Sequence, residues 1–170
     1  AGEILVHGKV ATIHSPQDAV AHGIGYLSED RKQFGLATGL DVETNVVLAT
    51  LSRFAAARFW LDQGRIHATA SDYVKRLAIK TPSVEQQVRL LSGGNQQKIV
   101  IAKWLGTDPD VLVMDEPTAG VDVGTKSEIV RIVRELAQTG KGILVISSEY
   151  PELIAMCDRF LIMRGGVIVD

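Results

Sequence analysis

The spacing of hydrophobic positions changes twice along the chain, and each change predicts a different kind of structure. Residues 1–38 contain short apolar runs separated by turn residues, which is typical of strands. Between them, Ser15 and Pro16 predict a short helix ending near His22, because serine caps helix amino termini and proline suits the first position. We expect strands at residues 3–6, 10–13 and 23–27, a turn at Gly8-Lys9 and a loop at Gly35.

From Val42 to about Leu105 the apolar positions repeat at helical spacing. Thr81-Pro82-Ser83 interrupts this pattern, and a third helix is expected from Ser92 to Leu105. The two earlier helical faces comprise Val46, Val47, Thr50 and Leu51, then Ile66, Ala70, Tyr73, Val74 and Leu77. This region therefore predicts an α-helical insert.

The remaining third alternates apolar strands with amphipathic helices. Strands are expected at residues 111–114, 142–146, 160–163 and 167–169, with helices around residues 129–137 and 151–156. Gly140 is expected to end the longer helix, and Gly165-Gly166 to turn the chain. This alternation indicates an α/β domain with a parallel sheet.

Composition narrows the function without defining it. The chain has 170 residues, of which 46% are hydrophobic and 22% charged, so a disordered tail, a fibre and a membrane bundle are excluded. The net charge of −2 argues against nucleic-acid binding, and we assign Arg31-Lys32 to a solvated or docking face. A single cysteine fits a reducing, cytoplasmic setting. The four histidines have no spacing typical of metal ligands.

The first residues run directly into an apolar strand. Ala1-Gly2-Glu3 includes no initiator methionine, and no signal-peptide pattern follows it. We therefore expect the chain to begin inside a larger protein.

Two adjacent carboxylates follow the apolar run at residues 111–114. Open α/β sheets bind ligands at the carboxyl ends of their strands, where Asp115 could hold Mg²⁺ and Glu116 could orient and deprotonate a water. Alternatively, the strand simply ends in solvated acids.

A second motif, Leu-Ser-Gly-Gly-Asn, precedes the third helix at residues 91–95. Ser92 and the amide of Gly94 are suited to donate hydrogen bonds to phosphate oxygens, because a helix amino terminus has free N–H groups and partial positive charge. Alternatively, this is only a capped helix after a glycine turn. The third motif, Ala119-Gly120-Val121-Asp122, gains meaning only from its place directly after the acids.

The order of these motifs adds information that none carries alone. LSGGNQQKIVIAKWL followed by DPDVLVMDEPTAGVD closely resembles the signature, Walker B and D-loop succession of ATP-binding-cassette (ABC) ATPases. The resemblance covers nearly the whole chain. The segments GEILVHGK, SPQDAVAHGIGYLSEDRKQFGL and LSGGNQQK look most like the second cassette of fused sugar importers of the ribose, galactose and xylose type.

The resemblance implies a fold with three parts. It predicts an α/β, RecA-like three-layer core of the P-loop NTPase type, with a helical signature subdomain and a small antiparallel β region. The corresponding boundaries are about 1–38 for the β region and Q-loop-like segment, about 39–105 for the signature subdomain, and about 106–170 for the RecA-like lobe.

The resemblance also implies roles for individual residues. In the family, two cassettes stack head to tail around two ATP molecules. Ser92, Gly93, Gly94 and Asn95 would contact the partner cassette's ATP. Asp115 would hold Mg²⁺ and Glu116 would act as the catalytic base for the nucleotide on this cassette, while Asp122 would cross the seam.

Four departures from the family pattern stand out. The sequence contains no Gly-x-x-x-x-Gly-Lys-Ser/Thr P-loop, which predicts that the P-loop strand and helix are missing from this chain. Glu29 stands at the Q-loop glutamine position, and Ser148 at the switch-histidine position. Asn95, a milder change, replaces the usual glutamine.

We expect part of a sugar importer's ATP-binding subunit, peripheral on the cytoplasmic side of the membrane. Implied partners are a second cassette, membrane permease subunits docking near the Glu29 loop, and indirectly an extracellular or periplasmic sugar-binding protein. The chain alone should hydrolyse ATP negligibly. Alternatives are a non-catalytic or regulatory cassette that completes a partner's ATP site and, less favoured by the sequence, a cytosolic cassette for DNA repair or translation.

Overall fold

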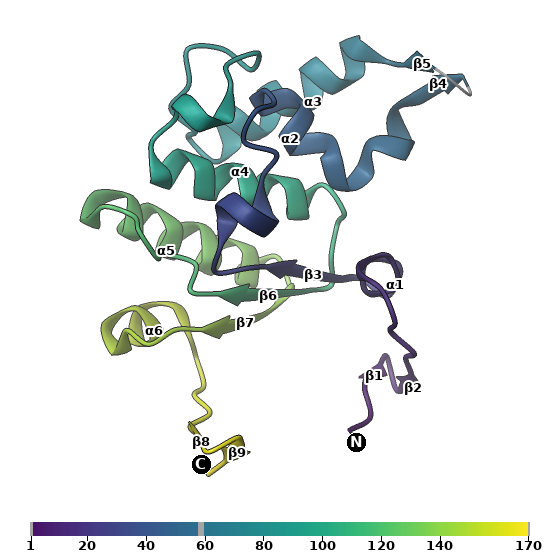
Figure 1. Cartoon of the computed structure of the whole chain (residues 1–170). Coiled ribbons are helices and arrows are strands. Elements are labelled where there is room, and N and C mark those ends of the chain that lie inside the picture. Colours follow the sequence, from purple (N-terminus) through teal and green to yellow (C-terminus); the bar gives the residue numbers. More distant parts are fainter. Residues whose placement is uncertain (1, 58–59, 170) are drawn as a thin grey trace.

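A parallel sheet lies at the centre of the computed structural model, which describes residues 2–57 and 60–169 (Figure 1). Its strands are β3 (Ile24–Leu27), β6 (Val111–Asp115) and β7 (Gly142–Ile146), in the order β3-β6-β7. Leu112 of β6 pairs with Gly25 on one side and Ile143 on the other. The three carboxyl ends therefore meet at one edge of the sheet.

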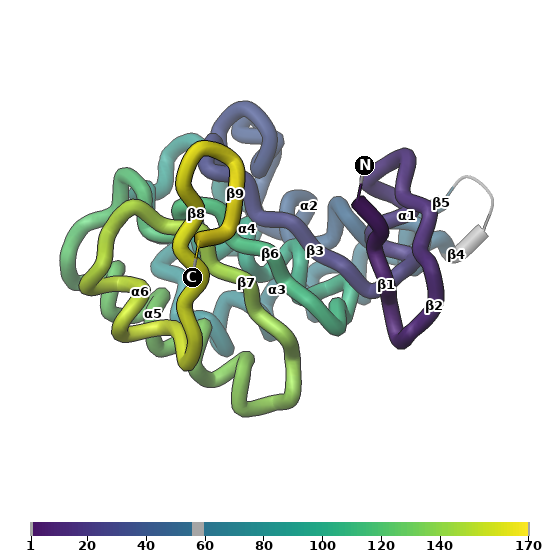
Figure 2. The backbone as a smooth tube through the Cα atoms, turned by 90° about the horizontal axis from the view of Figure 1, so that it is seen from below, coloured from purple at the N-terminus to yellow at the C-terminus, as the bar shows by residue number. Residues whose placement is uncertain are grey.

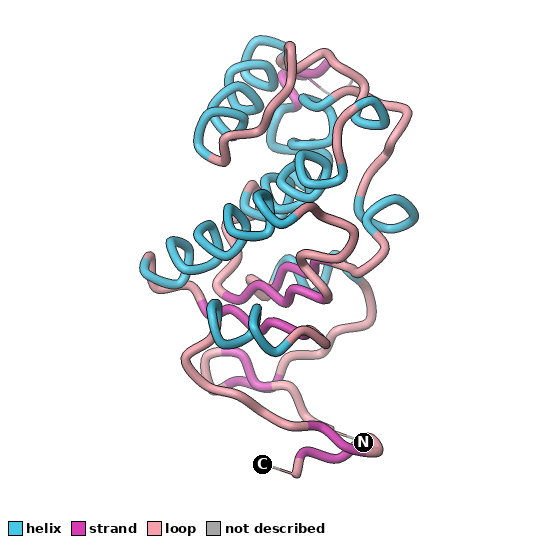
Figure 3. The backbone as a smooth tube through the Cα atoms, turned by 90° about the vertical axis from the view of Figure 1, so that its left-hand side faces the viewer, coloured by secondary structure: helices cyan, strands magenta, loops and turns pink. Residues whose placement is uncertain are grey.

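Helices cover one face of this sheet (Figure 3). Leu27, Leu112 and Met114 are buried beneath α4 (Gly93–Leu105) and α5 (Val123–Gln138). On the alternate positions, which point to the opposite face, four large side chains are 38–49% exposed. These are Tyr26, Val111, Leu144 and Ile146.

The α4 helix is buried between the sheet and the helical region above it (Figure 1). Two of its lysines are anchored internally. Lys98 Nζ donates to the carbonyl of Ala78 at 2.8 Å and to Glu128 at 2.5 Å. Lys103 Nζ donates to the carbonyl of Gly35 at 2.6 Å, and burial lowers the pKa of this lysine.

The predicted helical insert is largely confirmed. It contains α2 (Val42–Val47), η2 (Leu48–Phe54), α3 (Gln63–Arg76) and η3 (Val88–Leu90), with α4 completing it. Aspartates cap α2 and α3, and Ser92 caps α4 as predicted. The sequence pattern missed a hairpin of β4 (Ala55–Ala57) and β5 (Trp60–Leu61) between the first two helices. Its two short strands leave too brief an alternation to be seen beside the helical pattern.

Two further hairpins lie at the ends of the chain (Figure 2). The strands β1 (Leu5–Val6) and β2 (Lys9–Val10) are joined by a turn at His7-Gly8, whereas the sequence predicted it at Gly8-Lys9. His7 and Gly8 both have positive φ, as the two central residues of a tight hairpin turn do. The strands β8 (Met163–Arg164) and β9 (Val167–Ile168) turn at Gly165-Gly166, as predicted.

The remaining helices include one correction. The helix α1 (Pro16–Ala21) is capped by Ser15 as predicted, and α6 (Tyr150–Met156) also confirms its prediction. Gly35, expected in a loop, ends the helical turn η1 (Arg31–Gly35), whose cap is Asp30. Within the described residues, each helix is too short or too polar to cross a lipid bilayer.

The strand predicted at residues 160–163 is wrong. Phe160, Leu161 and Ile162 are about half exposed, and only Met163 belongs to a strand. A single further bond, from the amide of Val169 to the carbonyl of Ile162, extends the terminal hairpin. The apolar run has neither a covered face nor a neighbouring strand in the described part of the chain, and hydrophobicity alone does not form a ladder.

The ion pair between Lys98 and Glu128 gives a stability prediction. The Lys98 side chain is 1% exposed, whereas Glu128 is 37% exposed. Glu128→Gln should lower the free energy of unfolding by about 1–3 kcal/mol, since it removes the negative charge that neutralises a buried ammonium. Lys98→Met should cost less, because it removes the buried charge and keeps the volume. Urea unfolding of both variants checks this order, and an equal or reversed order contradicts it.

The same pair predicts a pH dependence. The hydrogen bond from Lys98 holds the pKa of Glu128 below its ordinary value of 4.5. A carboxyl with a lowered folded pKa stabilises the fold above the unfolded pKa and loses this effect as pH falls through the folded pKa. The stability difference between wild type and Glu128→Gln should therefore be constant at neutral pH and shrink below about pH 4.5. A difference that stays constant into acid contradicts the prediction.

Candidate functional site

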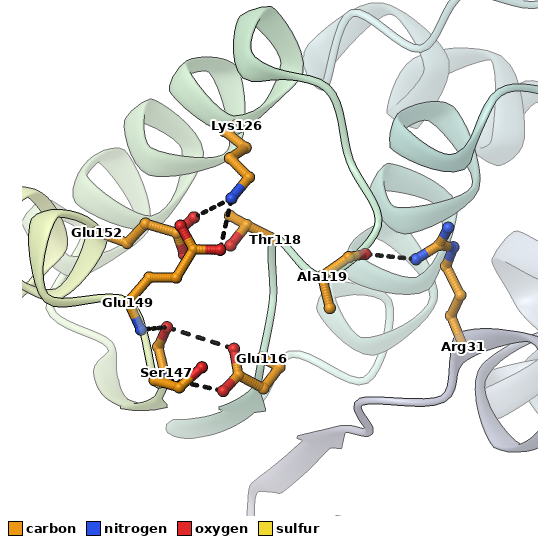
Figure 4. A network of polar contacts seen from close by, with 9 residues as sticks. Arg31, Glu116, Thr118, Ala119, Lys126, Ser147, Glu149 and Glu152 are labelled. Carbon is orange, nitrogen blue, oxygen red and sulfur yellow. Dashed lines mark hydrogen bonds and ion pairs between the residues drawn. The ribbon is translucent and has the colours of Figure 1, made fainter.

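The loop after β6 places Glu116 against the end of β7 (Figure 4). Glu116 has a left-handed backbone with φ of +43°, a conformation that costs a non-glycine residue roughly 1 kcal/mol or more. Its carboxylate accepts a hydrogen bond from the amide of Ser148 at 2.8 Å and lies 3.4 Å from the hydroxyl of Ser147. The strained turn therefore aims the carboxylate at the segment that follows β7.

Asp115 lies at the last position of β6, on the exposed face of the sheet. Its carboxylate accepts a hydrogen bond of 3.0 Å from the hydroxyl of Tyr26 on β3. This hydrogen bond raises the pKa of Tyr26, because an ionised phenol could no longer donate to the carboxylate. Tyr26 thus orients Asp115 at the carboxyl edge, a contact that the sequence pattern did not predict.

The amino terminus of α4 is built around Ser92 and Asn95. Ser92 Oγ accepts from the Asn95 amide nitrogen at 3.5 Å and from its Nδ2 at 2.9 Å. Asn95 Oδ1 in turn accepts from the amide of Lys80 at 2.8 Å, which ties the helix to the preceding loop. Ser92 itself is exposed. Its hydroxyl hydrogen therefore remains available to a ligand at the end of a 13-residue helix.

Both glycines of this turn are required by close packing. A Cβ on Gly94 would overlap the side chain of Thr125, including its Cβ at 2.9 Å. A Cβ on Gly93 would lie 2.6 Å from Arg31 Nη2 and 2.8 Å from the carbonyl oxygen of Gly120. The amino terminus of α4 therefore lies directly against the first turn of α5 and the loop before it.

Arg31 connects three segments that are distant in sequence. Its Nη1 donates to the carbonyl of Ala119 at 2.7 Å (Figure 4). Its Nη2 lies 3.4 Å from the carbonyl of Gly120. Its Nε is buried and has no hydrogen-bond partner among the described residues. Our assignment of Arg31 to a solvated or docking face is therefore wrong. No local pattern signals a contact that spans 88 residues.

Asp122 is the N-cap residue of α5. Its carboxylate accepts from the amide of Thr125 at 3.0 Å and from the Thr125 hydroxyl at 2.8 Å. The amide hydrogen bond lowers the pKa of Asp122, so the residue stays ionised. Thr125 also lies against Gly94. It is therefore a shared neighbour of Asp122, the D-loop acid, and of the turn at residues 92–94, which we call the signature turn.

Lys126 joins α5 to Glu149 and Glu152, at the start of α6 (Figure 4). Its Nζ lies 2.8 Å from carboxylate oxygens of both Glu149 and Glu152, and these hydrogen bonds raise the pKa of Lys126. Glu152 is buried and also accepts from the hydroxyl of Thr118. Burial raises the pKa of Glu152, but the bonds from Lys126 and Thr118 outweigh it and leave the pKa lowered.

The structure therefore groups most of the predicted site residues in two clusters. One contains the signature turn, Arg31 and the D-loop, and the other contains Glu116 with Ser148. Glu29 is exposed and contributes its backbone carbonyl to the amide of Arg31 at 3.1 Å. The segment after residue 115 runs from one cluster to the other.

The donor set suits phosphate and a divalent cation. An exposed hydroxyl at a helix amino terminus favours an anion. A single carboxylate at a strand end suits Mg²⁺, which takes its other ligands from phosphate and water. A parallel sheet with an acid pair at its carboxyl edge agrees with the RecA-like core that the sequence predicts.

The chain belongs to the ABC transporter family, whose model matches residues 1–119. Solved structures agree on the fold. A dimeric ATP-binding cassette in a post-hydrolysis state, bound to ADP and Pi, superposes with a TM-score of 0.81 at 21% identity, covering 100% of this chain and 72% of that one. A nucleotide-free ATP-binding cassette from an ABC transporter gives 0.79 at 22%, covering 96% and 66%.

Closer relatives carry sugar-import names. The chain is 60% identical over 166 residues to a putative ribose/galactose/methyl galactoside import ATP-binding protein of Burkholderia ambifaria, covering 98% of this chain and 32% of the relative. It is 50% identical to the xylose import ATP-binding protein XylG of Thermoanaerobacter pseudethanolicus, covering 98% and 33%. The chain thus spans about a third of the length of the curated relatives it matches.

The contacts of Arg31 predict that its substitution lowers stability more than substitution of its neighbour Lys32 does. Arg31→Met should lower the free energy of unfolding by about 1–2 kcal/mol, because two loop carbonyls lose a charged donor. Lys32→Met, at an exposed position beside it, should change stability by less than about 0.5 kcal/mol. Thermal and urea unfolding measure both. Hydrogen exchange of the residue 119–122 amides should also quicken only in Arg31→Met, and equal behaviour of the two variants contradicts the role.

Proposed function

We propose that this chain is part of the ATP-binding subunit of a sugar importer, in which ATP binding and hydrolysis are coupled to carbohydrate uptake. The support comes from the import names of relatives that match 98% of the chain, together with the two residue clusters described above. The residue ranges 1–38, 39–105 and 106–170 serve as the β and Q-loop-like region, the signature subdomain and the RecA-like lobe.

The observation that carries the proposal is the packing of the signature turn. Gly93 and Gly94 are enclosed by Arg31 and Thr125, while Ser92 stays exposed beside the loop at residues 119–122. Such a turn presents the Ser92 hydroxyl outward, away from the packed glycines. It therefore serves the γ-phosphate of ATP held by a second cassette, with Asn95 orienting Ser92 and Asp122 facing the seam.

The acid pair serves the nucleotide site of this cassette. Asp115 would hold Mg²⁺, which would neutralise phosphate charge. Glu116 accepts the proton of the attacking water, and its left-handed backbone sets the position of the carboxylate that accepts it. Residues that cradle the α- and β-phosphates are not among the motifs of this sequence.

One contact favours a second candidate function, in which the chain completes a partner's ATP site and does not turn over ATP at its own. The Glu116 carboxylate is already engaged by the amide of Ser148, at the position where the family has its switch histidine. A serine side chain cannot supply the ring-nitrogen contact of histidine to a phosphate. This cassette would then contribute its signature turn to the partner's ATP site and would not hydrolyse ATP at its own.

The remaining partners follow from the import proposal. Permease subunits dock beside the exposed Glu29 loop and the helical region, and a sugar-binding protein delivers the carbohydrate to them. The chain then works at the cytoplasmic face of the membrane as a peripheral component. Neither ribose, galactose nor xylose is favoured by any residue of this chain.

Assembly with a partner cassette that carries a P-loop tests the proposal. Ser92→Arg should lower phosphate release by about a hundredfold, because it removes a phosphate donor and blocks the seam. Ser52→Arg, at an exposed serine of the helical region, is the control and should leave the rate unchanged. If Ser92→Arg and Ser52→Arg give the same rate, the signature role is wrong.

Glu116→Gln, made in a form of the subunit that also carries a P-loop, separates the two candidate functions. It should slow phosphate release only if the site of this cassette turns over ATP, whereas an unchanged rate supports the cassette that only completes its partner. The isolated chain should release phosphate no faster than its Glu116→Gln variant. Saturable turnover by the chain alone that Glu116→Gln abolishes would contradict this expectation.

A further inference from the structure

Three potential metal ligands converge in the helical region, away from the nucleotide site. Glu43 lies in the first turn of α2, His67 on α3, and Glu85 in the loop before η3. Their nearest ligand atoms all lie within 4.8 Å of one another. We propose that these three residues form a Zn²⁺-binding site. This inference is independent of the sugar-import proposal.

The distances suit a tetrahedral ion. His67 Nδ1 lies 3.1 Å from Glu43 Oε2 and 3.4 Å from Glu85 Oε1. A tetrahedron with metal–ligand bonds of about 2.0–2.1 Å has edges of about 3.3–3.4 Å, so an ion fits between these atoms with small side-chain movements. One imidazole and two carboxylates are ligands that Zn²⁺ accepts, and the two negative charges balance the ion.

The backbone holds two of the ligands at a fixed separation. The amide of Glu43 donates to the carbonyl of Val84 at 2.9 Å, and the amide of Val42 donates to the carbonyl of Gln86 at 3.1 Å. The loop that carries Glu85 is therefore hydrogen-bonded to the start of α2. This frame reduces the ordering cost of binding, because ligand positions are set before the ion arrives.

The ion would have an accessible fourth position. His67 and Glu85 line an open pocket of about 250 Å³ whose other polar side chains are Ser71, Lys75, Thr81 and Ser83. The His67 side chain is 54% exposed, so solvent reaches the site. A water completes the coordination there, which matches three protein ligands plus one open position.

Binding at this position would join three elements of the helical region. The α2 helix, α3 and the loop at residues 79–87 would be linked through one ion, and that loop leads into η3 and Ser92. Zn²⁺ would thereby stiffen the segment that sets the signature turn. Without the ion, the same three side chains form a histidine–carboxylate ion-pair cluster, which is the competing explanation.

Calorimetric titration of the metal-free chain with Zn²⁺ alone tests the site. We expect one Zn²⁺ per chain and a rise in Tm of about 5–10 °C at a hundredfold excess over Kd. His67→Gln and Glu85→Gln should each weaken binding by more than about tenfold, since even partners of metal ligands contribute that much. Co²⁺ in the same site should show the intense visible absorption of a tetrahedral complex.

His7→Gln is the matched control. His7 is also an exposed histidine at 3.1 Å from a carboxylate, that of Asp110, but it pairs with one carboxylate rather than two. Its substitution should leave the Zn²⁺ affinity unchanged. The absence of binding, or equal affinity in wild type, His67→Gln and Glu85→Gln, would overturn the proposal and leave an ion-pair cluster. Because Glu85 is 58% exposed, Glu85→Gln tests the site with little risk to folding.

Discussion

The close packing of α4 against α5 is the contact on which the arrangement of the candidate site depends. Gly94 lies so near Thr125 that no Cβ fits between them, and Thr125 also holds the Asp122 carboxylate through its amide and hydroxyl. The signature turn and the D-loop acid are therefore fixed by one residue. Arg31 adds a second link, because it lies beside Gly93 and also contacts the carbonyls of Ala119 and Gly120.

From this contact the organisation extends to the acids. The segment after β6 runs from the strained Glu116 to the carbonyls bound by Arg31, and Lys126 ties its middle to α6 through the buried Glu152. At its start, the Glu116 carboxylate accepts a hydrogen bond from the amide of Ser148, just after β7.

The sequence predicted elements and motifs well where the cause is local. Caps at Ser15 and Ser92, the strands at residues 111–114 and 142–146, and the glycine turn at 165–166 are all confirmed, since each depends on neighbouring residues. The contacts of Arg31, the Tyr26 hydrogen bond to Asp115 and the His67 cluster were not predictable. Each contact joins residues that are far apart in sequence, and a local sequence pattern does not indicate which distant residues meet in the fold.

Replacing Gly94 with alanine tests most directly whether the α4–α5 contact holds the site together. The added methyl must displace Thr125, so Gly94→Ala should lower the free energy of unfolding by about 1–3 kcal/mol and quicken amide exchange at Thr125. Gly39→Ala is the control, because a Cβ there meets nothing within 4 Å and its φ is not positive. Equal stability and equal exchange in the two variants would contradict the account.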